Sequence, residues 1–178
     1  MRSFFYLLLL GVALATLAIV VRSGLLARKH PGQPINSAMR AALEDEGTPE
    51  LPAADADFIR QNFPTAHLTP SGLRYLVRDP GTGTATPHFG QEVIVNYDGR
   101  LLDGTRFDSS FQRGVPFTFH LGTGAVIKGW DEAFLTMHKG EKRTLIIPYW
   151  LGYGTTGHGR SIPPRATLVF DVELIDFR

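Results

Sequence analysis

The chain has 178 residues and a formal charge of +1, from 18 Lys and Arg against 17 Asp and Glu, and this length allows one ordinary domain with additional segments. Hydrophobic residues make up 43% of the sequence, which excludes a wholly disordered chain, and 19 Gly with 12 Pro favour a turn-rich β structure. The chain contains no Cys, so disulfides, thiolate metal ligands and Cys nucleophiles are excluded.

The small net charge conceals three regions of different composition. Residues 1–34 carry four basic residues and no acidic one, residues 35–67 carry two basic and six acidic residues, and residues 68–178 carry a net charge of +1. We therefore predict a targeting or anchoring segment over 1–29, a proline-rich acidic linker over 30–67, and one folded domain over 68–178.

Residues 4–21 form an uncharged, apolar run at the amino terminus. As a helix rising about 1.5 Å per residue, this run has about the length of a bilayer's hydrocarbon core. The sequence Ala13-Leu14-Ala15 is similar to a signal-peptide cleavage site. Cleavage there would leave an apolar stub, so an uncleaved membrane-anchoring helix is favoured over secretion after cleavage. Basic residues flank the run on both sides and leave its orientation in the membrane open. N-terminal signal-anchors ordinarily place the following domain outside the cytoplasm, so in a bacterium we expect this domain in the periplasm.

The linker prediction rests on frequent Pro and Gly between residues 30 and 67, which break any long helix. Short helices remain compatible with the pattern at 37–46, capped by Ser37, and at 55–62, capped by Asp55. A semi-flexible stalk is the preferred interpretation, and a dimerisation helix is the alternative.

Short alternating apolar runs separated by Gly and Asp turns predict an antiparallel sheet from residue 71 onward. One amphipathic helix is expected over 130–137, ended by Gly140, and the dipeptide Asp103-Gly104 signals a hairpin. A single helix among antiparallel strands indicates an α+β architecture with the sheet covered on one face. Strands are expected at 73–77, 92–97, 117–121, 142–147 and 167–175.

Several familiar chemistries are excluded by the motifs that the domain lacks. Lys128 precedes Gly129 and no Ser or Thr follows, so the Walker phosphate-loop order fails. There is no Gly-x-Ser-x-Gly elbow, and the six His lack metal-ligand spacing; we expect His120 on a strand surface and His138 at a helix end. Basic residues are scattered among acidic ones, so nucleic acid is not an expected partner.

Six motifs in sequence carry a resemblance to a known family: Tyr97-Asp98-Gly99, 103–110, Pro116-Phe117, 126–130, Tyr153-Gly154 and 162–170. In order and spacing, these resemble the FKBP-type peptidyl-prolyl cis-trans isomerases over about residues 70–178. The resemblance implies a twisted antiparallel β-sheet of five to six strands wrapped around one short α-helix, preceded here by the hydrophobic helix and linker. It also implies an X–Pro isomerase that assists protein folding and uses no cofactor or metal, with proline-containing polypeptides as substrates and macrolides as further ligands.

The resemblance implies a proline pocket with Trp130 as its floor. Asp108 and Arg113 match the family's polar pair, within reach of the Tyr97 hydroxyl. Departures from the family pattern at Ala125 and in the loops 111–115 and 160–161 leave the substrate preference open. The catalytic residues implied are Tyr97, Phe107, Asp108, Tyr153 and Phe170. The substrate-binding residues implied are Arg113, Phe117, Val126, Ile127, Trp130 and Ile162.

Taken one by one, these aromatic residues are also typical of a sheet core, and Phe119, which matches no pocket wall, is expected to be core. Two other functions remain open. One is a non-catalytic binding module or holdase chaperone with the same fold, although the complete aromatic set argues against it. The other is a scaffold subunit that depends on the linker helices.

Overall fold

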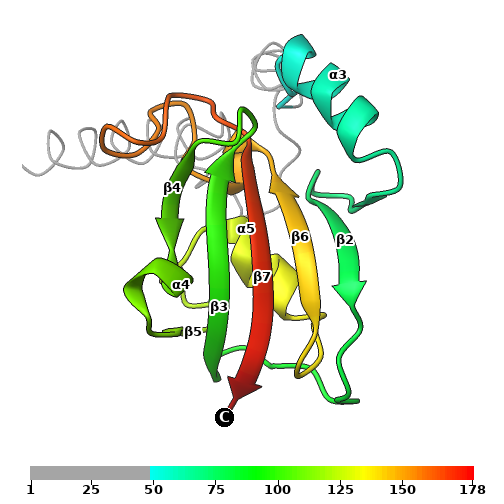
Figure 1. Cartoon of the computed structure of the whole chain (residues 1–178), viewed down its shortest axis with the longest axis vertical. Coiled ribbons are helices and arrows are strands. Elements are labelled where there is room, and N and C mark those ends of the chain that lie inside the picture. Colours follow the sequence, from blue (N-terminus) through cyan, green and yellow to red (C-terminus); the bar gives the residue numbers. More distant parts are fainter. Residues whose placement is uncertain (1–48) are drawn as a thin grey trace, which may run out of the picture. The chain divides into compact units, whose positions relative to one another are not determined.

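The structure is a computed structural model that describes residues 49–178, and these form one compact unit from Pro49 to Arg178. Seven antiparallel strands form a single sheet in the order β1-β2-β6-β7-β3-β4, with β5 paired to β3 (Figure 1). The strands are β1 (His67–Leu68), β2 (Arg74–Asp79), β3 (Glu92–Leu101), β4 (Arg106–Ser109), β5 (Phe117–His120), β6 (Lys142–Ile147) and β7 (Leu168–Phe177). The helices are α3 (Ala53–Asn62), α4 (Ser110–Arg113), α5 (Lys128–Phe134) and the short 3-10 helix η1 (Tyr149–Leu151).

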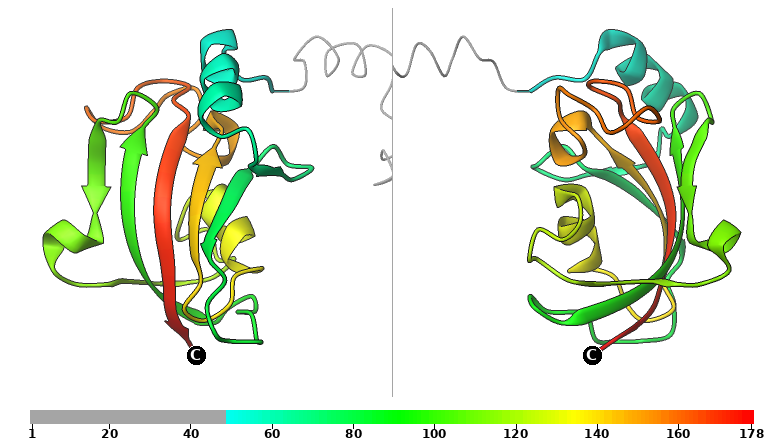
Figure 2. Two further views of the ribbon diagram at one scale, coloured as in Figure 1. Left: turned by 45° about the vertical axis from the view of Figure 1, so that its right-hand side comes forward. Right: turned by 90° about the vertical axis from the view of Figure 1, so that its left-hand side faces the viewer.

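The sheet curves around α5, which lies against its concave face (Figure 2). Alternate residues of the two long strands point to this face, such as Val93 and Val95 on β3 and Val172 and Leu174 on β7, and all four are buried. From the helix, Trp130 and its neighbours Ala133 and Phe134 complete the core. The predicted α+β fold with one helix on one face of an antiparallel sheet is therefore confirmed.

Strand β3 is central, because it pairs with β4, β5 and β7. The turn after it is the hairpin predicted at Asp103-Gly104: the Leu101 amide donates to the Thr105 carbonyl (2.9 Å), and the Thr105 amide donates to the Asp103 carboxylate (2.8 Å). Gly104 has φ +87°, in the left-handed region that favours glycine. The hairpin brings β4 back beside β3 and so fixes the residues that follow it.

The other predicted strands are present with ends shifted by one to four residues, and β6 has the predicted bounds. The expected helix over 130–137 begins and ends earlier, at Lys128 and Phe134. Its last turn tightens, with Thr136 and Met137 amides donating to carbonyls three residues back. The helix-ending role predicted for Gly140 is wrong, because its amide donates to the Leu174 carbonyl of β7 (2.7 Å).

Helix α3 was expected at 55–62 and begins two residues earlier, directly after Pro52. The capping role predicted for Asp55 is wrong: the carboxylate lies in the first turn and accepts a hydrogen bond from the Thr167 hydroxyl (2.6 Å), which precedes β7. Ile59 of α3 is buried. These contacts hold α3 against the end of the sheet.

The predicted hydrophobic helix over 4–21 and the predicted helix over 37–46 lie outside the described residues. Within 49–178, none of the helices combines the length and hydrophobicity needed to cross a bilayer.

Candidate active site

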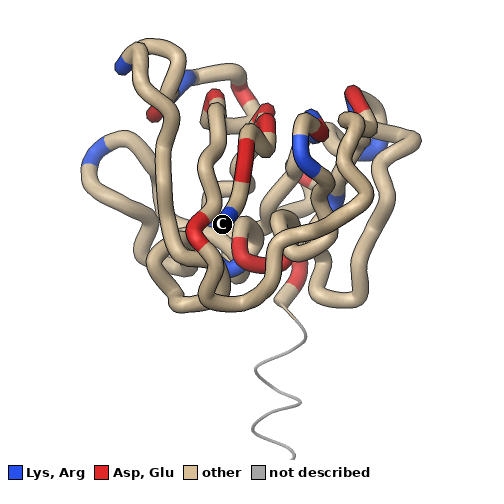
Figure 3. The backbone as a smooth tube through the Cα atoms, turned by 90° about the horizontal axis from the view of Figure 1, so that it is seen from below, with Lys and Arg blue, Asp and Glu red and all other residues tan. Residues whose placement is uncertain are grey.

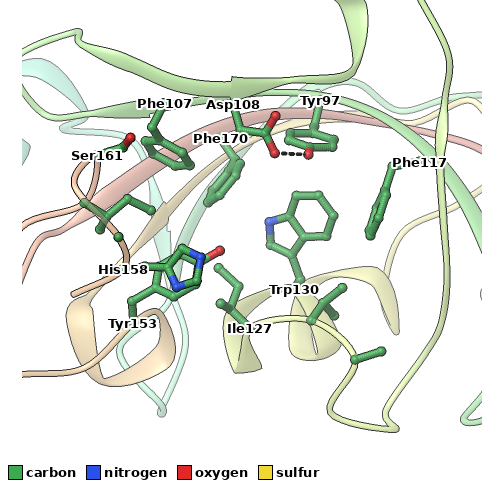
Figure 4. A pocket seen from close by; sticks show the side chains of 14 residues that line it. Tyr97, Phe107, Asp108, Phe117, Ile127, Trp130, Tyr153, His158, Ser161 and Phe170 are labelled. Atoms are coloured by element: carbon green, nitrogen blue, oxygen red, sulfur yellow. Dashed lines mark hydrogen bonds between the residues drawn. The ribbon is translucent and has the colours of Figure 1, made fainter. Parts of the chain in front are cut away.

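A pocket of about 510 Å³ lies between α5, the concave face of the sheet, β4 and the loop between η1 and β7 (Figure 4). Its volume falls in the range of small-ligand sites. All the predicted site residues except Arg113 line it. The lining residues are Tyr97, Phe107, Asp108, Phe117, Ala125, Val126, Ile127, Trp130, Tyr153, His158, Gly159, Ser161, Ile162 and Phe170.

Trp130 forms the floor of the pocket and is only 4% exposed. Its ring packs edge-on with Tyr97 (centroids 4.9 Å apart, interplanar angle 81°) and with Phe170 (5.2 Å, 75°). These are the edge-to-face arrangements that aromatic quadrupoles favour. The indole nitrogen faces the cavity in Figure 4, and it has no hydrogen-bond partner among residues 49–178. The floor is therefore a closely packed aromatic surface, and its indole nitrogen is buried without a partner among residues 49–178.

One wall depends on a glycine within β3. Phe107 from β4 packs edge-on with Phe170 from β7 (5.4 Å, 84°), and both rings lie over Gly99. A Cβ atom at Gly99 would come within 2.7 Å of Phe170 and 2.8 Å of Phe107, which is closer than non-bonded carbon atoms approach one another. The missing side chain therefore gives the two rings the space in which they meet. Sequence reasoning quoted Gly99 within the motif Tyr97-Asp98-Gly99 but gave it no role, although a lone glycine inside a strand is a signal of close approach.

A polar cluster closes the side of the pocket at Tyr97. The Tyr97 hydroxyl donates to the Asp108 carboxylate, and Arg113 donates to that hydroxyl (2.8 Å) and forms an ion pair with Asp108. The Ser109 amide also donates to Asp108 (2.8 Å). Arg113 stands outside the lining, with its guanidinium 5.3 Å from the centre of the Tyr97 ring. Its contact with the site therefore runs through Tyr97 and Asp108.

Both pocket phenols hold their protons well above neutral pH. Burial, followed by the hydrogen bond to Asp108, raises the pKa of Tyr97 to about 12, against the opposing effect of Arg113. Burial and the negative charge of Asp108 raise the pKa of Tyr153. Both hydroxyls are therefore donors under physiological conditions.

The loop side of the pocket supplies further groups that sequence reasoning missed. His158 stacks on Tyr153 (4.8 Å, 21°) and pairs with Ile162 through two backbone hydrogen bonds (2.9 and 3.1 Å). This pairing holds Ile162 at the rim. No periodic pattern marks this irregular loop, so the proximity of His158 gave no signal in the sequence.

Ile127 precedes α5, and its backbone amide has no acceptor among the described residues. Ile127 and Tyr153 both line the pocket. The site thus combines an aromatic floor with separate donors on two sides.

Neither this pocket nor the rest of residues 49–178 holds a cluster of three or more His, Asp or Glu side chains suited to a metal ion. Charged residues of both signs are spread over these strands and loops (Figure 3). Phe119 is buried as expected, His120 is exposed on β5 as expected, and His138 is partly exposed just beyond α5.

An antiparallel sheet thus curves around one helix, and a pocket lined by aromatic rings lies between them. Residues 83–175, more than half of the chain, match the family model described as FKBP-type peptidyl-prolyl cis-trans isomerase. The chain belongs to this family, as its motifs indicated.

Individual relatives agree with this assignment. The chain is 57% identical over 86 residues to an FK506-binding protein of Neisseria meningitidis serogroup C, covering 48% of this chain and 79% of the relative. It is 55% identical over 96 residues to the peptidyl-prolyl cis-trans isomerase FKBP15-2 of Arabidopsis thaliana, covering 54% of this chain and 59% of the relative. The crystal structure of FkpA from Escherichia coli superimposes with a TM-score of 0.63 at 40% identity, covering 80% of this chain and 65% of FkpA.

Replacing Gly99 tests the aromatic wall. We expect Gly99→Ala to lower the free energy of unfolding of residues 49–178 by about 1–3 kcal/mol, because the new methyl group displaces two packed rings. Urea unfolding measures this change. The double variant Gly99→Ala with Phe170→Leu should lose less unfolding free energy than the sum of the losses in the two single variants. A Gly99→Ala variant with wild-type stability would contradict the close approach.

The raised pKa of Tyr97 predicts a pH dependence of stability. The folded state keeps the phenol proton to about pH 12, whereas an unfolded tyrosine loses it near its model value of 10.0. The contribution of this group is therefore complete below pH 10 and declines as the pH rises from 10 to 12. Urea unfolding of wild type and Tyr97→Phe should give a constant stability difference from pH 7 to 9 and a shrinking advantage of the wild type at pH 11. An unchanged difference at pH 11 would exclude the shift.

Proposed function

We propose that this chain is a peptidyl-prolyl cis-trans isomerase that rotates X–Pro bonds in protein substrates and so assists folding. The observation that carries the proposal is the aromatic-lined pocket over Trp130, beside a backbone amide, that of Ile127, with no acceptor among residues 49–178. Names of relatives in the family point the same way. The chain spans only 59% of the Arabidopsis relative, so the activity is proposed for this chain on its own residues.

The chemistry requires no nucleophile. Rotation about an X–Pro bond is opposed by amide resonance, with a barrier of about 18–20 kcal/mol, and takes tens to hundreds of seconds unaided. A planar amide has a large dipole that water solvates, whereas the twisted amide has lost conjugation and is less polar at its carbonyl. A pocket that excludes water therefore favours the twisted form over the planar one.

Each group of the pocket has a defined part in this mechanism. Trp130 and Phe170, whose rings meet at an angle of 75°, contact the pyrrolidine ring from below and from one side. The Ile127 amide and the Tyr153 hydroxyl donate to carbonyls of the bound chain. Asp108, fixed by Tyr97 and Arg113, places a negative charge beside the twisting bond. Because each tenfold in rate needs only about 1.36 kcal/mol of preferential binding, a few such contacts suffice.

A protease-coupled assay on a proline tetrapeptide such as Ala-Leu-Pro-Phe tests the activity. Residues 49–178 should accelerate isomerisation, and Phe170→Ala or Trp130→Ala should lower kcat/KM at least tenfold, because each removes a ring that grips proline. Phe89→Ala is the matched control: that ring is 71% exposed and lies outside the pocket, so its loss should leave the rate unchanged.

A rate equal to the spontaneous one, with a folded domain, would reject the isomerase. Suppression of aggregation that persists in the Phe170→Ala variant would instead support a non-catalytic holdase. The pocket also fits macrolide ligands of the kind that the name of the Neisseria relative indicates, and such a ligand should compete with the tetrapeptide.

We further propose that residues 4–21 anchor the chain in a membrane and hold the domain outside the cytoplasm, the periplasm in a bacterium. The support is the sequence alone: an uncharged apolar run followed by a proline-rich acidic stretch. These residues precede the part of the chain that the structure describes.

Fractionation of cells that express the full chain tests the anchor. The protein should stay with membranes after carbonate extraction, keep its amino terminus on sequencing, and be cut by protease added from outside the cytoplasm. A soluble product whose new amino terminus follows Ala15 would establish secretion after cleavage instead.

A further inference from the structure

A second cavity of about 470 Å³ lies on the opposite face of the sheet from the aromatic pocket. Thr144 and Asp171 are paired neighbours on β6 and β7, and each alternates along its strand with a residue that faces the core, such as Leu145 and Phe170. Helix α3 forms the other side of this groove, beyond the end of the sheet in Figure 1. The groove is lined by Phe58, Phe63, Arg78, Arg100, Leu101, Leu102, Gly104, Thr144, Val169 and Asp171.

One half of the groove is apolar and incompletely covered. Phe58 of α3 is 38% exposed, and its ring lies 6.4 Å from that of Phe63, at an angle of 55°. Leu101 and Leu102, from the end of β3 and its hairpin, are also partly exposed. These apolar side chains lie together around one cavity, which distinguishes them from apolar residues exposed singly.

The other half is polar and has an excess of positive charge. The Arg78 Nε donates to the Thr144 hydroxyl (2.9 Å), which donates to Asp171 (2.7 Å), and Arg100 forms an ion pair with the same carboxylate. The Asp171 carboxylate therefore already has two partners, Thr144 and Arg100. Within residues 49–178, Arg78 pairs with no carboxylate, so the terminal nitrogens of its guanidinium remain available. A guanidinium in this state binds a carboxylate through two parallel hydrogen bonds.

We propose that this groove binds a second stretch of protein chain, in which a large apolar side chain lies next to an acidic residue. The apolar side chain packs between Phe58 and the leucines of the hairpin, and the carboxylate pairs with Arg78. Charge complementarity selects this occupant. One available arginine beside an acidic partner is too little for a nucleic acid backbone, which is neutralised by several basic residues at once.

The groove gives the domain two polypeptide sites on opposite faces of one sheet. A client held in the groove presents its nearby prolines to the isomerase pocket at a high effective concentration, so the client binds more tightly than either segment alone. This consequence rests on the proposed isomerase function. Binding in the groove itself does not, because the groove shares no residue with the pocket.

Isothermal titration calorimetry on the full chain tests the groove with a proline-free peptide, acetyl-Gly-Asp-Leu-Phe-Gly-amide. The peptide should bind one site, and Arg78→Gln and Phe58→Ala should each weaken binding at least about fivefold. Replacing Asp by Asn in the peptide should weaken binding to wild type by the same factor, and should make no difference to Arg78→Gln. That pattern assigns the carboxylate to Arg78.

Two matched variants serve as controls. Lys142→Gln removes a cation that lies outside the groove lining, and Phe89→Ala removes an exposed ring elsewhere; neither should change the affinity. Thermal unfolding should show that every variant is folded. Arg78 is exposed, so Arg78→Gln keeps the test valid even where Phe58→Ala loosens α3.

The outcomes separate this proposal from the isomerase activity. A saturating excess of Ala-Leu-Pro-Phe should leave the affinity of the proline-free peptide unchanged, and displacement would assign the peptide to the aromatic pocket. Absence of binding at millimolar peptide, or binding indifferent to Arg78 and Phe58, would overturn the proposal. A third result would also overturn it: the protein binds phosphatidylglycerol vesicles through Arg78 but does not bind the peptide. The groove would then be a membrane contact.

Discussion

The contacts of Trp130 join the core of this domain to its binding pocket. Its ring meets Phe119 and Phe134 on the buried side, at 5.7 and 5.4 Å, and Tyr97 and Phe170 on the pocket side. The floor of the site is therefore also a central part of the core, and its position is fixed by packing rather than by a flexible loop. A pocket that acts by excluding water depends on such a floor, because a mobile ring would admit solvent.

Much of the fold could be predicted because its signals are local. The strand over 142–147 alternates cleanly and is bounded by turn residues, and Asp103-Gly104 has the chemistry of a hairpin. The helix end was harder: Met137 continues the apolar spacing and is buried, yet the helix stops at Phe134. Gly140 was misread because its amide bonds to a distant strand, a tertiary contact that no local pattern contains.

The site was predicted through ordered motifs rather than through chemistry visible in single residues. Tyr97 and Phe170 are 73 positions apart in sequence, and only the pairing of β3 with β7 makes their rings neighbours. Physical reasoning on one residue at a time would have left both in the core. His158 and the groove beside α3 were missed for a related reason: the first lies in an irregular loop, and the second combines residues from five elements and a hairpin. Arg113 was anticipated as a partner of Asp108, although it stands outside the pocket that it supports.

The placement of Trp130 also allows its fluorescence to report on the pocket. The chain has only two tryptophans. Trp150 is half-buried and donates its indole N–H to the Ser71 carbonyl (2.8 Å), away from the pocket. Indole emission depends on the polarity of its surroundings, so a ring seated on Trp130 alters one fluorophore and leaves the other as a constant background. Occupancy of the pocket can therefore be followed by intrinsic fluorescence, without any label.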